Sequence, residues 1–164
     1  MTQVRHDPCK MREAAVHQAG HTVMMELLDI PYDRVSIAHG RPRCAWIWVS
    51  GVERATGPVQ RAFMALMAGV VAQRLLLDRH VDTQRRYTAE SDHDLALAAR
   101  LLRSVTDDAR ENTRLLRETL DRLKPNACAI DAIANRLLAQ PTLTSREVGM
   151  TLGATLVGCE PVMS

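Results

Sequence analysis

Apolar residues recur at helical spacing along most of this chain. Between Ala15 and Leu27 they return every third or fourth position, which is the spacing of one buried helix face. A longer, more strongly apolar stretch over residues 58–78 predicts a central buried helix. With the capping and helix-breaking residues at their borders, these patterns predict helices over residues 10–28, 58–78, 91–104, 107–123 and 126–139, and a short last helix that begins with the capping box Thr144–Glu147.

Two short segments after the first helix interrupt the helical pattern. Residues 34–38 and 44–50 are rich in β-branched and aromatic residues, which favours strands, and residues 39–42 between them carry turn chemistry. Alternation along the second strand places Trp46 and Trp48 on the same face. The expected fold is therefore mainly α, a compact helical domain with one small β-hairpin after the first long helix.

Length and composition favour a single helical domain. The chain has 164 residues, which predicts one domain over residues 1–164, with a polar and flexible segment at 1–8. Only 3% of the residues are aromatic, so Leu, Ala, Val and Met must fill the core, a composition that suits helix packing.

Charge and cysteine usage exclude several classes of protein. The formal charge is only +2 and the Arg residues are scattered among Asp and Glu, so we expect no nucleic-acid partner, although a helical DNA-binding regulator remains a minor alternative. The four cysteines form no C-x-x-C pair. Since no secretory signal and no apolar run of about 20 residues occur, we expect a cytoplasmic protein without a membrane segment. We also find no phosphate-binding loop of an ATPase.

The candidate chemistry lies in the first helix. His17 and His21 are one turn apart on the same face, so both imidazoles could reach one zinc ion. The zinc-peptidase pattern H-E-x-x-H has a Glu as general base after the first His, and here that position is Gln18. Gly20 between them costs about 1 kcal/mol relative to Ala, which points to a packing or functional reason. Two His at this spacing occur often by chance, so the spacing alone favours exposed or core histidines over a metal site.

The residues around this pair resemble the peptidase domain of FtsH-type enzymes. The stretch Arg12–Val23 resembles that family's zinc helix, "A-x-H-E-A-G-H-A-[VL]". Four further segments are similar to the family's later motifs and occur in the same order: residues 30–37, 65–75, 91–99 and 143–152. The resemblance thus covers about residues 11–152. The family's transmembrane segments and ATPase domain have no counterpart in the sequence.

The resemblance implies a third zinc ligand. By position it is Asp94, which with the two histidines would leave a fourth site for water, as a catalytic zinc requires. The residues themselves also allow Ser91 and Asp94 to be a capping pair at a helix start. His93 and Asp92 are the neighbouring alternatives for the ligand. Cys9 is either a fourth, inhibitory ligand or a free thiol.

The resemblance further implies a zinc-dependent metalloendopeptidase that acts on flexible or unfolded protein segments. In the family an edge strand beside the zinc helix pairs with substrate, so Trp46, Ile47 and Trp48 are candidate substrate-binding residues, unless that strand only packs on the helices. A separate ATPase or unfoldase is a possible partner, and the oligomeric state is open.

Gln18 makes this form of the enzyme impaired, because an amide cannot accept a proton from a metal-bound water. Either a Glu→Gln substitution was introduced to inactivate a peptidase, or the natural protein lacks the base. The alternative function is a non-catalytic, peptidase-like module that binds proteins.

Overall fold

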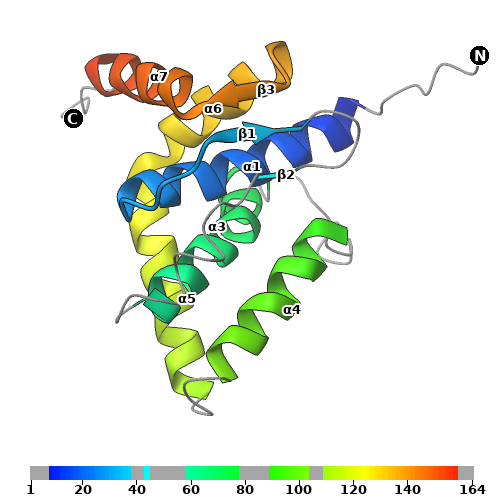
Figure 1. Ribbon diagram of the computed structural model, residues 1–164, viewed down its shortest axis with the longest axis vertical. Coiled ribbons are helices and arrows are strands. Elements are labelled where there is room, and N and C mark those ends of the chain that lie inside the picture. Colours follow the sequence, from blue (N-terminus) through cyan, green and yellow to red (C-terminus); the bar gives the residue numbers. More distant parts are fainter. Residues whose placement is uncertain (1–7, 38–42, 45–57, 78–88, 104–108, 159–164) are drawn as a thin grey trace, which may run out of the picture.

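The computed structural model describes residues 8–37, 43–44, 58–77, 89–103 and 109–158. Over these ranges the chain is mainly helical, as the sequence predicts (Figure 1). No helix in the described ranges combines the length and the hydropathy needed to cross a bilayer. In chain order the elements are α1 (Pro8–Leu27), β1 (Arg34–Ser36), β2 (Arg43–Cys44), α3 (Pro58–Leu77), α4 (Ala89–Arg103), α5 (Ala109–Leu123), the 3-10 turn η2 (Lys124–Asn126), α6 (Ala127–Ala139), β3 (Thr142–Thr144) and α7 (Ser145–Gly158).

Two helices form the centre of the molecule. In α1 every residue from Ala15 to Met25 is buried, and in α3 every residue from Ala62 to Ala72 is buried. The prediction of a central buried helix over 58–78 is confirmed. The single buried stripe predicted for the first helix is wrong, because α3, α5, α6 and the strands pack around α1 from several directions. Leu27 at its end is 40% exposed.

Small residues allow α1 and α3 to pack closely. A Cβ atom added to Gly20 would lie 2.4 Å from Ala72 Cβ and 2.6 Å from the Ala68 carbonyl oxygen. Such distances are well below van der Waals contact, so no larger residue fits at position 20 without separating the helices. The helix-propensity cost of this glycine therefore has a packing reason.

The N-terminus of α1 corrects one boundary prediction. We expected residues 1–8 to be flexible, but Pro8 is the first residue of the helix, the position where the missing N–H of proline costs nothing. Residues 1–7 lie outside the described part of the chain.

A Schellman turn ends α1. Asp29 has φ of 50°, Ile30 N–H donates to the Met25 carbonyl at 2.9 Å, and Asp29 N–H donates to that of Glu26 at 3.2 Å. Ile30 and Met25 are both buried, which supplies the apolar contact that accompanies this motif. The turn directs the chain into β1.

The strands form one small antiparallel sheet in the order β2-β1-β3. Val35 of β1 lies opposite both Cys44 and Leu143. The predicted hairpin is thus confirmed, but the first strand ends at Ser36 instead of residue 38, and residues 45–50 of the second lie outside the described ranges. The sequence did not predict β3, which joins the sheet from more than 100 residues away along the chain.

The capping box at α7 is confirmed. Thr144 N–H donates to Glu147 Oε2 at 2.8 Å, and Glu147 N–H donates to Thr144 Oγ1 at 3.3 Å. The helix is 14 residues long rather than short. Its first residue is also tied to the sheet, since Ser145 N–H donates to the Asp33 carbonyl.

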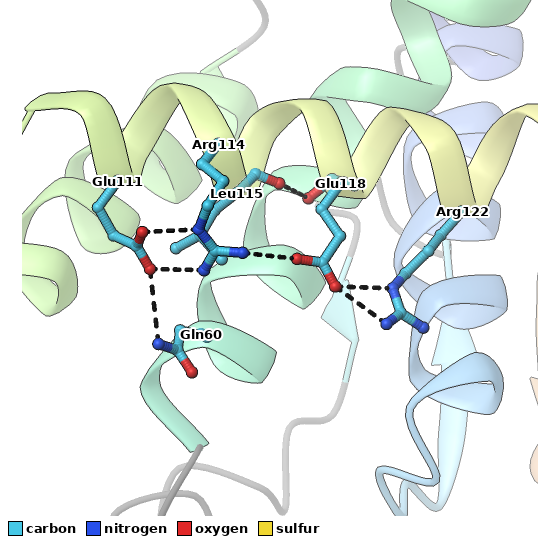
Figure 2. A network of polar contacts seen from close by, with 7 residues as sticks. Gln60, Glu111, Arg114, Leu115, Glu118 and Arg122 are labelled. Carbon is cyan, nitrogen blue, oxygen red and sulfur yellow. Dashed lines mark hydrogen bonds and ion pairs between the residues drawn. The ribbon is translucent and has the colours of Figure 1, made fainter.

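Arginine and glutamate alternate along the outer face of α5 (Figure 2). Arg114 bridges Glu111 and Glu118, and Glu118 also pairs with Arg122. These side chains lie at helical spacings of three and four residues, where opposite charges support an exposed helix. The opposite face is buried. The four charges of this row therefore pair with one another on the exposed side of α5.

Candidate metal centre

Two histidines of α1 face the same way inside the core. The residues His17 and His21 are each 1% exposed, and their ring centroids lie 4.5 Å apart in an edge-to-face arrangement. The two Nε2 atoms are 2.9 Å apart. The two histidines therefore share one face of α1, as predicted. The alternative that they are exposed is wrong.

Asp94 completes the group from α4. Its Oδ2 atom lies 2.9 Å from His17 Nε2 and 3.0 Å from His21 Nε2. Asp94 is 8% exposed, so the whole cluster is shielded from solvent. Helix α4 packs against α3, and α3 packs against α1 (Figure 1). This packing brings Asp94, which lies 73 positions after His21, to the histidines.

A backbone carbonyl sets the orientation of His21. The Nδ1 atom lies 2.7 Å from the carbonyl oxygen of Ala65 in α3. A carbonyl can only accept, so Nδ1 carries the hydrogen and donates it. The other ring nitrogen, Nε2, faces His17 Nε2 and Asp94 Oδ2. Metal-binding histidines commonly show this arrangement, in which the second nitrogen donates to a carbonyl or carboxylate.

Charge and burial act on the cluster in opposite directions. Burial lowers the pKa of His17 below its ordinary value, the charge of His21 lowers it further, and contacts with Asp94 and Gln73 only partly oppose this. Burial alone would raise the pKa of Asp94, but its hydrogen bonds with His17 and His21 outweigh that effect and hold the pKa below its usual range. The cluster therefore combines an ionised carboxylate with a His17 ring that favours its neutral form.

This donor set fits a divalent cation. Two imidazole nitrogens and one carboxylate oxygen lie pairwise within 3.0 Å of one another, and all three are atoms that a divalent metal ion accepts as ligands. The same three atoms also form an ion-paired cluster without a metal. Tetrahedral zinc with bonds of about 2.0–2.1 Å places its ligands roughly 3.3–3.4 Å apart, so the side chains would need to separate by only a few tenths of an ångström.

The alternative ligands and the capping interpretation fare differently. The helix begins at Ala89, so Asp94 is its sixth residue and the expectation of a helix start at Ser91 is wrong. His93 is exposed, which removes it as a buried ligand. Cys9 is also exposed, and its thiol lies 4.0 Å from Glu13 Oε1. The side chain of Asp92 lies outside what the structure describes.

Gln18 is buried beside the first histidine in sequence. The residue is 3% exposed, and its Oε1 atom has no hydrogen-bond partner among the described residues. A buried amide oxygen without a partner is costly, by about 1–3 kcal/mol, and such groups call for an explanation in function. The predicted substrate residues Trp46, Ile47 and Trp48 lie outside the described ranges, so their role stays a prediction.

The sequence missed the contribution of α3 to this site. The Ala65 carbonyl is a backbone atom and leaves no mark in the sequence. Gly69 of α3 also lies against the two imidazoles. An isolated glycine inside a helical pattern often has a packing or functional reason, and this was the one sequence signal for its role.

Comparison with known proteins assigns no family. No protein-family model matches the chain, and none of the curated proteins matches it. The resemblance to FtsH-type peptidases therefore rests on the residues alone, and the function is argued from the site.

Proposed function

We propose that this protein is a zinc-binding domain of the metalloendopeptidase type, with His17, His21 and Asp94 as the metal ligands. The observation that carries the proposal is the convergence of their Nε2, Nε2 and Oδ2 atoms within 3.0 Å of one another in a buried site. Two imidazoles and one carboxylate are a ligand set used by catalytic zinc, which keeps a fourth position for water.

Each ligand has a defined task. His17 and His21 would supply nitrogen donors from consecutive turns of α1, and Asp94 would supply negative charge to offset part of the charge of a bound ion. The carbonyl of Ala65 would keep His21 oriented for this role, since it accepts from Nδ1. When bound, zinc polarises a scissile carbonyl and activates water for attack on it. A protein or peptide segment in extended conformation is the proposed substrate.

Gln18 limits the rate of hydrolysis that this site could support. The amide can hydrogen-bond a water molecule, but it cannot take a proton from it. Loss of a general base commonly costs about 10²–10⁴ in rate. We therefore propose that the present form is a strongly impaired peptidase, in which the metal site remains complete.

The first experiment measures bound metal. Elemental analysis of untagged protein should give about one zinc per chain, while His17→Ala and Asp94→Ala should each lose it. Asp33→Asn is the matched control, because Asp33 is an exposed carboxylate paired with the adjacent Arg34, and its removal should leave the zinc content unchanged. Parent protein that takes up no zinc even when zinc is supplied would overturn the proposal.

The second experiment restores the base. Zinc-loaded Gln18→Glu should cleave a panel of permanently unfolded proteins about 10²–10⁴ times faster than the parent. The same substitution in a His17→Ala background is the control, and it should remain inactive. Zinc-loaded Gln18→Glu that cleaves nothing would contradict the peptidase proposal.

A second candidate is a protein-binding module built on the same metal site. The observation that favours it is Gln18 itself, a buried residue that cannot act as base. In that case zinc content would be as above, the Gln18→Glu protein would stay inactive, and an unfolded polypeptide would bind without being cleaved.

A further inference from the structure

One face of α3 lines both imidazoles. Ala65, Gly69 and Gln73 follow one another at spacings of four residues, so they lie on the same side of the helix, one turn apart. The Ala65 carbonyl accepts from His21, as described above. At the other end, Gln73 Nε2 donates to the carbonyl of Glu13, one turn before His17. Helices α1 and α3 are therefore antiparallel along this contact.

Gly69 lies at the middle of this face, against the rings themselves. A Cβ atom at this position would lie 2.5 Å from His21 Nε2, 2.6 Å from His17 Cε1 and 2.7 Å from His17 Nδ1. Atoms this close overlap, so a side chain of even one carbon would have to displace one or both imidazoles or the helix. The shortest of these contacts would be with His21 Nε2, which is a proposed metal ligand.

The second ring nitrogen of His17 belongs to the same contact. His17 Nδ1 is buried and has no hydrogen bond of ordinary geometry to a described residue, although the Gln73 side chain interacts with the ring. The other nitrogen of the ring, Nε2, lies 2.9 Å from Asp94 Oδ2. Any group added at Gly69 would therefore act directly on an imidazole that contacts Asp94.

Gly20 offers a matched comparison. It is also a mid-helix glycine at the α1–α3 contact, but a Cβ atom there would strike Ala72 and the backbone at Ala68, not a histidine. The two glycines therefore separate general crowding of the two helices from crowding of the metal-site rings.

We infer that Gly69 is a positioning residue of the His17–His21–Asp94 site, required because the backbone of α3 passes so close to the imidazoles that only a residue without a side chain lets both Nε2 atoms meet Asp94. The inference deepens the proposed function, and only its metal-binding arm rests on that function.

A thermodynamic cycle tests the inference without metal. Gly69→Ala should lower the melting temperature of the metal-free parent. In a background with His17, His21 and Asp94 all replaced by Ala, the same substitution should be neutral or raise it, because alanine favours the helix and fills space that the rings vacated. Gly20→Ala should lower the melting temperature in both backgrounds. An equal loss from Gly69→Ala in both backgrounds would overturn the inference.

Metal affinity and histidine spectra provide the second arm. In the folded fraction, zinc affinity of Gly69→Ala measured by chelator competition should fall at least 10–100-fold, and that of Gly20→Ala should change far less. Nitrogen-15 spectra of the imidazoles should show the His21 Nδ1–H tautomer in the parent and its loss in Gly69→Ala. If the parent binds no zinc, the proposed function fails, while the cycle and the spectra still decide the role of Gly69. If Gly69→Ala binds zinc as tightly as the parent and keeps the same His21 tautomer, the positioning role of Gly69 is refuted.

Discussion

Zinc should stabilise the fold, and Asp94 should be required for most of that effect. His17 and Asp94 lie 77 residues apart in sequence, so an unfolded chain cannot hold the three ligands together. Binding is then confined almost entirely to the folded state, and the full binding free energy appears as stability. Asp94→Asn is the sharpest perturbation, because it keeps the size of the side chain and removes its charge.

The size of the effect follows from mass action. At a free zinc concentration of 100 times the dissociation constant, the folded state gains about 2.7 kcal/mol. For a chain of this length each kcal/mol shifts the melting temperature by about 2–4 °C, so zinc should raise it by roughly 5–11 °C. If Asp94→Asn weakens binding about 100-fold, the same zinc concentration stabilises by only about 0.4 kcal/mol, or roughly 1–2 °C.

The assay is thermal unfolding followed by circular dichroism, with and without zinc at one fixed free concentration. Asp33→Asn serves as the control and should show the same zinc-dependent shift as the parent. The comparison uses the shift caused by zinc within each variant, so a change in the stability of the metal-free protein does not affect it. An equal shift in the parent and Asp94→Asn would refute the assignment of Asp94 as a ligand.

Three further predictions concern the fold around the site. The Thr144 backbone N–H and the side chains of Gln140 and Thr144 hold the pKa of Glu147 at about 2, below its ordinary value, so the capping box stabilises α7 above pH 4.5 and this contribution is lost as pH falls toward 2. In melting curves recorded from pH 7 to pH 2, Glu147→Gln should be less stable than the parent at neutral pH and approach it at the acidic end; a constant difference would contradict this. Asp29→Gly should increase the free energy of unfolding by about 0.5–1 kcal/mol and so raise the urea midpoint, because glycine adopts positive φ without steric cost. An unchanged or lower midpoint would count against the Schellman turn. Leu143→Ala should cost about 2–5 kcal/mol in urea unfolding, since Leu143 is fully buried; a loss below 1 kcal/mol would show that β3 is not part of the core.

Helix positions were largely readable from the sequence, because their signals are local. The Thr144–Glu147 capping box acts within one turn, and the predicted helices overlap those found. The start of α4 was misplaced by two residues because Ser91 is a good capping residue that tertiary packing placed inside the helix.

The strand β3 was beyond sequence reasoning. It has three residues, it follows Pro141 directly, and its last residue, Thr144, already belongs to the capping box, so it is too short for an alternating pattern. They form a strand because β1, more than 100 residues earlier, presents an edge with which they pair. The helix before β3, α6, packs against α1, and this packing brings β3 to β1.

The candidate site divides in the same way. That His17 and His21 share a face follows from helix geometry alone, so the sequence determined it. The convergence of Asp94 with them depends on the packing of α4 on α3 and of α3 on α1, and the sequence pointed to Asp94 only through a family resemblance. The orientation of His21 by a carbonyl and the need for glycine at 69 depend on how closely two helices approach. Spacing along one helix is a local property of the backbone, whereas distances of a few ångströms between helices are decided by the complete packing of the core.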